Sequence, residues 1–302
     1  MISICIPIHN YYAYPLVRRL VNQIHQMKFD DDFEIVCIDD YSTGYNFKQN
    51  KGIGEIATYL RLEENVGTAK TRNLFLKYTQ GEWLLFLDAD SLIPQDFLSN
   101  YKKVSKSDAS VIVGGREYDK SANDAEHKLH YLFGKKNEVA SLDIRKANPY
   151  KYFLSCNFMI RREMLERNKF DSFLDELGCD DAIYAYGLQQ KRIPILHIEN
   201  SVTCGNVETN AEFLHNTVIE VENLVKAYDI LWEDQRLCHS LKLLRRYATI
   251  RNMHLQGFVN FLFKLFNSLL ESHFVGGKAI TLSQFEFYRL AIFIRKMHYS
   301  ED

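Results

Sequence analysis

The sequence has no apolar run long enough to cross a membrane. Its most apolar window, residues 257–270, is interrupted by Asn260, Lys264 and Asn267 and is too short to span a bilayer. Residues 1–8 contain no basic region and no long apolar stretch, so we expect no secretory leader. These absences argue against a membrane-spanning protein.

Cysteine motifs are also absent. The six cysteines lie at positions 5, 37, 156, 179, 204 and 238, and they match neither a zinc-binding spacing nor CxxC. Cys5 and Cys37 fall inside apolar runs, where cysteine acts as a small hydrophobic residue. We therefore expect a reduced, cytosolic setting and no disulfide framework.

Glycine-rich nucleotide loops are missing as well. No G-x-x-x-x-G-K-[ST] occurs, which excludes a P-loop, and no G-x-G-x-x-G occurs, which disfavours a Rossmann dehydrogenase. The net charge of -2 argues against a nucleic-acid partner. The charge is unevenly distributed, however. Residues 236–302 carry ten basic and four acidic side chains, a net charge of +6, whereas residues 1–235 carry a net charge of -8. This distribution indicates a separate partner for the tail.

What is present is a repeated alternation of strand and helix patterns, which predicts an α/β fold with a mostly parallel sheet covered on both faces. The predicted strands are 2–7, 33–38, 58–62, 82–87, 110–114, 152–160 and 193–198. The predicted helices between them are 14–28, 68–78, 94–104 and 180–190. The polar segment 118–149 predicts a long, mobile functional loop with some helix.

From residue 210 onward the pattern is helical. The predicted helices are 210–232, 238–253, 257–273 and 282–297. We therefore predict a catalytic domain over 1–208 and a helical extension over 209–302. The extension either packs on the catalytic domain with solvated arginines, or it presents apolar and basic faces to a membrane surface or to a second copy.

The most informative segment is an apolar run, 84–87, that ends in Asp88 and Asp90. In open α/β sheets, ligands bind at the carboxyl ends of the strands. Two close carboxylates repel unless a cation lies between them, and Mg²⁺ and Mn²⁺ take carboxylates together with substrate phosphates. The alternative is an ordinary turn rich in Asp.

Two other predicted strands end in polar residues that belong at the same edge. These residues are Pro7, His9 and Asn10 after the first strand, and Asp39, Asp40 and Ser42 after the second. A carboxylate there would accept a hydrogen bond from a base such as uracil, and the His9 ring would stack on it. The alternative for the acidic pair is a turn that caps the next helix.

A third segment contains Asn65, Gly67 and Arg72 around a helix expected to start at Thr68. Gly67 permits close backbone approach, a helix start favours phosphate, and Arg72 lies one turn in. The alternative is a capped helix with a solvated arginine.

The fourth segment is the acidic pair Asp180 and Asp181 at the start of a late helix. Acids in a first turn are ordinary caps. As functional groups, paired carboxyls raise each other's proton affinity, which tunes one of them as a general base.

Taken in order, these segments resemble the family 2 glycosyltransferases of the GT-A fold. Their pattern runs roughly IPxYN, DDxS, NxGxxxxRN, DAD and ED, and the match covers about residues 1–205. Residues 155–162 and the pair Phe170 and Asp171 also resemble segments of that family.

The resemblance implies an inverting transfer of a sugar from a nucleoside-diphosphate donor, expected to be a UDP-sugar, to a saccharide or lipid-linked acceptor. The implied place is cell-surface polysaccharide or glycolipid assembly at the inner face of the cell membrane. The implied nucleotide pocket comprises Pro7, His9, Asn10, Asn65, Gly67 and Arg72, with Asp39 or Asp40 against the base and Ser42 nearby. Asp88 and Asp90 would hold ribose and Mn²⁺ or Mg²⁺, Asp181 would deprotonate the acceptor with help from Asp180, and Asn157 would lie near a sugar.

Three positions depart from the family pattern. His9 replaces Tyr or Phe but keeps an aromatic ring, and Asp180 replaces Glu. Cys204 falls about where many members have a metal-binding His, and a thiolate suits Mg²⁺ poorly. We therefore expect either a weaker metal site or one that uses water or His197 instead. This departure keeps open a nucleotide-sugar-binding or scaffold protein with impaired catalysis. A sugar nucleotidyltransferase is a further alternative, but its glycine-rich amino-terminal loop is lacking.

Overall fold

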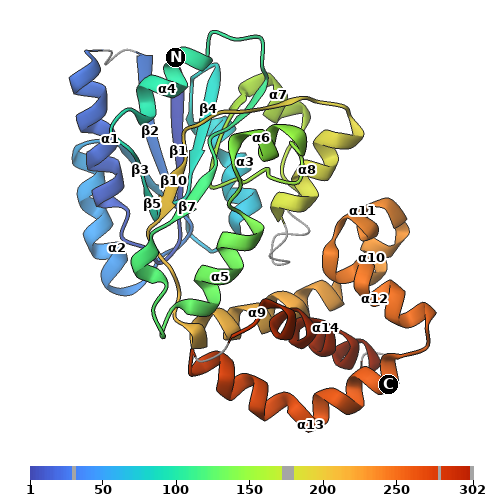
Figure 1. Ribbon diagram of the computed structural model, residues 1–302. Coiled ribbons are helices and arrows are strands. Elements are labelled where there is room, and N and C mark those ends of the chain that lie inside the picture. Colours follow the sequence, from blue (N-terminus) through green and yellow to red (C-terminus); the bar gives the residue numbers. More distant parts are fainter. Residues whose placement is uncertain (29–31, 172–179, 278–279, 300–302) are drawn as a thin grey trace. The chain divides into compact units, whose positions relative to one another are not determined.

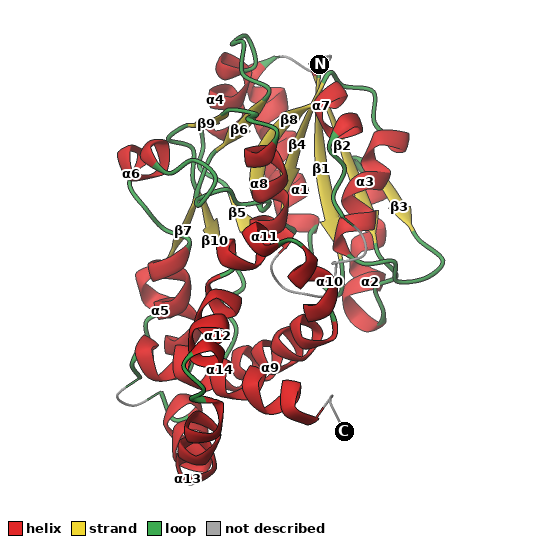
Figure 2. Cartoon of the chain, turned by 90° about the vertical axis from the view of Figure 1, so that its right-hand side faces the viewer, coloured by secondary structure: helices red, strands yellow, loops and turns green. Residues whose placement is uncertain are grey.

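The computed structural model describes residues 1–28, 32–171, 180–277 and 280–299 (Figure 1). The chain divides into two compact units. The first comprises Met1–Glu117, Glu138–Asp175 and Ile183–Asn206, and the second comprises Tyr118–Asn137, Glu176–Ala182 and Val207–Asp302. Apart from the last residue of β7 (Arg116–Tyr118), the strands lie in the first unit, and the second unit is built from helices (Figure 2). The predicted division at 208/209 stays a prediction.

The first unit is built on a seven-stranded sheet of order β3-β2-β1-β4-β8-β6-β9. Its strands are β1 (Ile2–Ile8), β2 (Phe33–Asp39), β3 (Thr58–Arg61), β4 (Trp83–Leu87), β6 (Val111–Val113), β8 (Asn157–Arg161) and β9 (Ile195–His197). Only β8 runs antiparallel to its neighbours β4 and β6. The predicted α/β class with a mostly parallel sheet is confirmed.

Helices cover both faces of this sheet. They are α1 (Tyr14–Met27), α2 (Gly44–Asn50), α3 (Thr68–Tyr78), α4 (Phe97–Val104), α6 (Leu142–Ala147), α7 (Arg162–Arg167) and α8 (Asp180–Gln190, whose first three residues belong to the second unit). Leu20 of α1 and Phe97 of α4 pack with one set of strand side chains, and Phe75 of α3 packs with the other. Because β4 is buried along its whole length, it reads as a continuous apolar run rather than an alternating one.

Strand β1 runs through Pro7 to Ile8, one residue beyond its predicted end. A proline inside a sheet removes one ladder hydrogen bond. On the β4 side the pairing stops at Cys5 and Phe86, whereas Pro7 pairs only with Ile38 of β2. The proline is tolerated because β1 no longer pairs with β4 at this position.

A second, three-stranded sheet joins β5 (Ser91–Leu92), β10 (Val202–Cys204) and β7 (Arg116–Tyr118) in the order β5-β10-β7. Cys204 pairs with Ser91 in this sheet. Chain segments more than a hundred residues apart therefore meet just after the Asp-Ala-Asp sequence.

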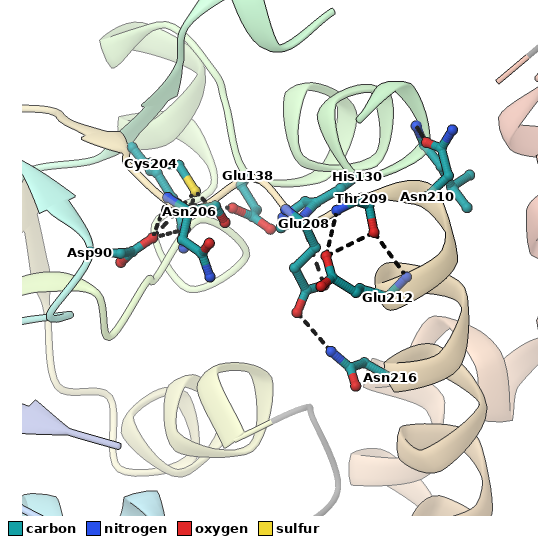
Figure 3. Close-up of polar contacts among 12 residues, drawn as sticks. Asp90, His130, Glu138, Cys204, Asn206, Glu208, Thr209, Asn210, Glu212 and Asn216 are labelled. Atoms are coloured by element: carbon teal, nitrogen blue, oxygen red, sulfur yellow. Dashed lines mark hydrogen bonds and ion pairs between the residues drawn. The ribbon is translucent and has the colours of Figure 1, made fainter. Parts of the chain in front are cut away.

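The second unit contains the predicted helical tail and part of the predicted loop. Its helices are α5 (Lys128–Asn137), α9 (Asn210–Lys226), α10 (Tyr228–Glu233), α11 (Gln235–Ser240), α12 (Lys242–Asn252), α13 (Gln256–Val275) and α14 (Leu282–Tyr299). Helix α9 starts at a capping box in which Thr209 and Glu212 exchange hydrogen bonds (Figure 3). None of the helices in the described ranges is long and apolar enough to cross a membrane.

Candidate functional site

Polar residues meet at the carboxyl edge of β1, β2 and β4. The register pairs Ile8 with Asp39, and the Asp40 N–H donates to the Ile8 carbonyl at 2.7 Å. The residues that follow these parallel strands therefore lie at one edge, as the sequence predicts. This is the edge at which open α/β sheets bind ligands.

His9 is fixed in one orientation and is exposed. Its Nδ1 lies 2.8 Å from the Asp40 carbonyl oxygen, which only accepts hydrogen bonds, so Nδ1 carries the proton. Nε2 is then an acceptor, and the Asn10 and Asn65 amide nitrogens lie 2.9 Å and 3.5 Å away. This network joins the polar end of the first strand to the segment that contains Asn65.

Asn10 joins the ends of β1 and β2. Its N–H donates to Ser42 Oγ at 2.8 Å, and its Oδ1 accepts from the Thr43 N–H at 2.9 Å. Asn10 has a φ of 50°, a conformation that asparagine tolerates better than most residues. The side chains of Asn10 and Ser42 thus hold the two strand ends in register.

The acidic pair after β2 is bound largely by the protein itself. Asp39 is fully buried, and its carboxylate accepts from the Ser42 N–H at 2.6 Å and from the Tyr59 hydroxyl. Asp40 accepts from the N–H groups of Val66 and Gly67 at 2.7 and 2.9 Å. The two carboxylates therefore hold turns, but no side chain caps α2, so the predicted alternative of a helix cap is wrong. Base recognition stays a prediction.

Tyr59 and Arg61 of β3 were not predicted. Burial, together with the neighbouring Asp39, raises the pKa of Tyr59, which keeps its hydroxyl protonated as a donor. The Arg61 guanidinium lies 4.6 Å over the ring of Tyr41, which is 41% exposed. No local sequence signal marks either residue, because each contact depends on how β3 pairs with β2.

Helix α3 begins at Thr68, as predicted, and Gly67 precedes it with φ 89° and ψ 163°. This backbone conformation is essentially restricted to glycine. No side chain caps the helix start, and the Asp40 contacts hold the preceding turn.

Arg72 lies on α3 and is only 4% exposed, so the alternative of a solvated arginine is wrong. Its Nη2 lies 3.4 Å from Asp88 Oδ1, and its guanidinium lies 5.3 Å over the Phe170 ring. A buried cation is costly without a counter-charge, so the Asp88 carboxylate offsets part of that cost. The structure thereby joins the third motif to the first carboxylate of Asp-Ala-Asp.

Asp90 lies in a different cluster, drawn in Figure 3. Its Oδ2 lies 3.5 Å from Arg116 Nη2, 3.4 Å from Cys204 Sγ and 3.3 Å from the Asn206 N–H nitrogen. Arg116 also donates to Cys204 Sγ at 2.8 Å and lies 3.5 Å from a Glu138 carboxylate oxygen. The family resemblance put Cys204 about where many members have a metal-binding His, and here its thiol contacts Asp90. No sequence signal marked Arg116.

Cys204 is a neutral thiol in this cluster. Burial raises its pKa to about 11, an effect that the Arg116 cation only partly offsets. The thiol is therefore a weak ligand for Mg²⁺ or Mn²⁺. His197, the substitute considered from the sequence, is buried in β9 with Nε2 2.9 Å from the Pro149 carbonyl oxygen.

The residues present suit a divalent cation only if a bound diphosphate supplies the remaining oxygen ligands of that cation. Among the described residues, no three His, Cys, Asp or Glu side chains form a metal-holding group. Mg²⁺ is commonly held by one or two carboxylates plus substrate phosphates, and Asp88 and Asp90 supply carboxylates of that type. The chemistry of this donor set therefore suits a cation that arrives with a diphosphate.

Asn157 was predicted near a sugar, but the structure buries it completely. Its amide nitrogen donates to the Gly115 and Asn200 carbonyls at 2.8 and 2.9 Å, and its Oδ1 accepts from the Tyr101 hydroxyl at 2.7 Å. In this arrangement the side chain joins two backbone carbonyls and one tyrosine hydroxyl, and it offers no exposed atom to a ligand. Its contribution is to position the turn after β6.

Asp180 and Asp181 occupy the first turn of α8, as predicted, and belong to the second unit. Gly178 and Cys179 of the same motif lie outside the described residues. Burial raises the pKa of Glu220 on α9 to about 7; the Arg289 cation partly offsets this increase, and Glu208 and Asp180 add smaller upward contributions.

The fold is that of an α/β protein, and the polar residues at the carboxyl ends of β1, β2 and β4 suit a phosphorylated ligand. The family described as glycosyl transferase family 2 matches residues 3–168, more than half of the chain. The chain therefore belongs to glycosyl transferase family 2, a family of glycosyltransferases, which confirms the resemblance found from the motifs.

Among curated relatives, the chain is 28% identical over 174 residues to poly(ribitol-phosphate) beta-N-acetylglucosaminyltransferase TarP of Staphylococcus aureus (strain N315), covering 56% of this chain and 51% of that protein. It thus spans about half the length of this relative.

Two solved structures support the GT-A fold. Mannosyltransferase PcManGT from Pyrobaculum calidifontis, in complex with GDP-Man and Mn²⁺, is 16% identical with a TM-score of 0.57, covering 100% of this chain and 88% of that one. S. aureus TarS 1-349 in complex with UDP-GlcNAc is 16% identical with a TM-score of 0.51, covering 99% and 91%.

Proposed function

We propose that the protein transfers a sugar, with inversion, from a nucleoside-diphosphate donor to a hydroxyl of a saccharide or lipid-linked acceptor. We further propose a UDP-sugar as the donor, and cell-surface polysaccharide or glycolipid assembly at the inner face of the membrane as the setting. Family membership and the name of the TarP relative support this proposal. The observation that carries it is the meeting of the β1, β2 and β4 ends at one polar edge of the sheet.

In this proposal the edge binds the nucleotide. The exposed His9 ring stacks on the base, and the hydrogen bond from Nδ1 to the Asp40 carbonyl oxygen holds the ring in place. Pro7 lines the floor of the pocket, and Gly67 lets phosphate approach the backbone before α3. Arg72 attracts the diphosphate and at the same time holds Asp88 in place.

Asp88 and Asp90 would hold Mn²⁺ or Mg²⁺, which when bound neutralises charge on the leaving nucleoside diphosphate. Asp181 accepts the proton of the acceptor hydroxyl as its oxygen bonds to the anomeric carbon and the bond to the diphosphate breaks. Asp180 raises the proton affinity of Asp181 by like-charge repulsion. Attack opposite to the leaving group inverts the anomeric carbon.

A second candidate is a nucleotide-sugar-binding protein with impaired catalysis. The neutral Cys204 thiol and the Arg116 cation beside Asp90 favour it, because both weaken the hold on a metal ion.

Asp181→Asn separates these candidates. For a transferase, we expect the variant to lose turnover by about a hundredfold or more while UDP binding changes less than about twofold. The matched control is Asp229→Asn, an exposed acid in the first turn of α10, which should leave both unchanged. A binding protein would show UDP affinity but no turnover in the unmodified chain.

A further inference from the structure

Arg145 of α6 is a buried cation with little charge to balance it. The residue is only 2% exposed. The carboxylate paired with it, that of Glu199, lies 3.6 Å away and its side chain is 72% exposed. Apolar residues of similar size are often at least as stabilising as a buried charge in such a place. The presence of Arg145 is therefore better explained by the geometry that it fixes than by stability.

The Arg145 guanidinium donates to three backbone carbonyls. Nη1 bonds to the Gly114 oxygen at 3.2 Å, Nη2 to the Ile198 oxygen at 3.1 Å and Nε to the Ala140 oxygen at 3.2 Å. The first carbonyl follows β6, the second follows β9 and the third precedes α6. Because a guanidinium is planar and rigid, its three bonds fix these three segments relative to one another.

Each of these segments also supplies one member of the cluster around Asp90. Arg116 follows the first carbonyl by two residues, Cys204 follows the second by six, and Glu138 precedes the third by two. Arg116 and Cys204 both contact the Asp90 carboxylate, and Glu138 contacts Arg116. Figure 3 draws Asp90, Cys204 and Glu138 near one another. The residue that holds the three segments therefore holds the backbone from which the cluster is built.

The turn that leads to Arg116 is tightly constrained. Gly115 has a φ of 97°, which side chains rarely adopt, and a Cβ added to Gly114 would lie 2.4 Å from Asn157 Nδ2. The Gly115 carbonyl accepts from Asn157 Nδ2 at 2.8 Å, and the Gly114 carbonyl accepts from Arg145. A change at Arg145 is therefore transmitted to Arg116 through two bonded residues.

We propose that Arg145 is a positioning residue, which fixes the Arg116 guanidinium and the Cys204 thiol against the Asp90 carboxylate. It acts on the proposed sugar transfer only through these groups. The effect on a metal ion rests on the proposed function, because that function assigns Asp90 to the cation. The effect on the placement of Cys204 does not.

Arg162 provides a matched control in the same unit. Its guanidinium also makes three hydrogen bonds, to the Gly81 and Leu76 carbonyls at 2.9 Å and to the Thr79 hydroxyl at 2.7 Å. These partners lie at the end of α3 and before β4, and none belongs to the Asp90 cluster. Arg162→Lys should therefore disturb the unit without reaching Asp90.

The first test is the rate at which iodoacetamide alkylates Cys204 in the full chain, without nucleotide or metal. Mass spectrometry of the peptide that contains Cys204 measures it. We expect Arg145→Lys to speed alkylation at least about fivefold, because the buried thiol becomes accessible when its segment loosens, and Arg162→Lys to change it less than about twofold. An unchanged rate in Arg145→Lys, or an equal rise in both variants, would overturn the proposal.

Urea denaturation checks that each variant folds. If Arg145→Lys does not fold, Gly115→Ala takes its place, because the added carbon would lie 2.9 Å from Arg145 Nη1 and displace the guanidinium. The same rise in the rate of Cys204 alkylation is expected, and an unchanged rate would again overturn the proposal.

The second test asks whether Arg145 acts through Arg116. Arg116→Gln removes a cation beside Asp90 and should strengthen Mn²⁺ binding to the UDP-loaded chain roughly fivefold, measured by electron paramagnetic resonance. We expect this gain to fall below about twofold when Arg145→Lys is also present, and to stay near fivefold with Arg162→Lys. A gain of equal size in both backgrounds would overturn the positioning role. A chain that does not bind UDP would instead contradict the proposed function, and the alkylation rates would still decide this inference.

Discussion

Arg116 sets the charge at Asp90. Its guanidinium lies between the Asp90 carboxylate, the Cys204 thiol and Glu138, so the protein places its own cation at the second carboxylate of Asp-Ala-Asp. A fixed positive charge within a few ångströms lowers the affinity of a site for a second cation. Cys204 and Arg116 therefore belong to one cluster around the Asp90 carboxylate.

Arg116→Gln should strengthen Mn²⁺ binding to the UDP-loaded protein. Removing the cation changes the interaction by about 1 kcal/mol in a partly exposed site, which corresponds to roughly fivefold in affinity. Titration of Mn²⁺ followed by electron paramagnetic resonance measures this. Arg116→Lys keeps the charge and should bind as the unmodified protein does; weaker Mn²⁺ binding by Arg116→Gln would contradict the explanation.

Asn157 illustrates a site residue predicted for one role and placed in another. Asn157→Ala would leave the Gly115 and Asn200 carbonyls and the Tyr101 hydroxyl without their buried partner. We expect a loss of about 2–5 kcal/mol in the free energy of unfolding, measured by urea denaturation. Asn22→Ala, an exposed change on α1, should cost less than about 0.5 kcal/mol. Equal stability of the two variants would show that the buried amide contributes little.

At the scale of elements, the strand ends determine the site. Apolar runs and their polar ends predicted the three strands that meet at the edge and the helix that starts at Thr68. Local pattern suffices there, because each side chain follows its strand directly. Contacts of Tyr59, Arg116 and Asn157 depend on pairing across the sheets between distant segments, and one sequence carries no signal for them.

The turn before α3 offers a test at this scale. Gly67→Ala forces a side chain into a backbone conformation that suits glycine, at a cost of about 1–3 kcal/mol. Because the Asp40 carboxylate holds this turn, we expect UDP affinity to fall at least about tenfold, measured by calorimetry. Gly54→Ala, whose added carbon meets nothing within 4 Å, is the control. Unchanged UDP affinity in Gly67→Ala would remove this turn from the nucleotide site.

For the whole molecule, stability should depend on pH through Glu220. Its pKa is raised from 4.5 to about 7, chiefly by burial, so the folded state favours the neutral carboxyl. This contribution is fully present below about pH 4.5 and is lost as the pH rises through 7.

Glu220→Gln removes that dependence. Relative to the unmodified chain, the variant should gain about 1–3 kcal/mol of unfolding free energy between pH 5 and pH 8, measured by urea denaturation at each pH. A stability difference that stays constant over this range would show that the Glu220 pKa is not raised.

The most direct test of the proposed transferase is release of nucleoside diphosphate from UDP-, GDP- and dTDP-sugars, with Mn²⁺ or with EDTA. We predict slow release from a UDP-sugar that requires the metal and is lost in Asp88→Asn. Release that persists with EDTA and in Asp88→Asn would contradict the proposed role of the Asp-Ala-Asp carboxylates.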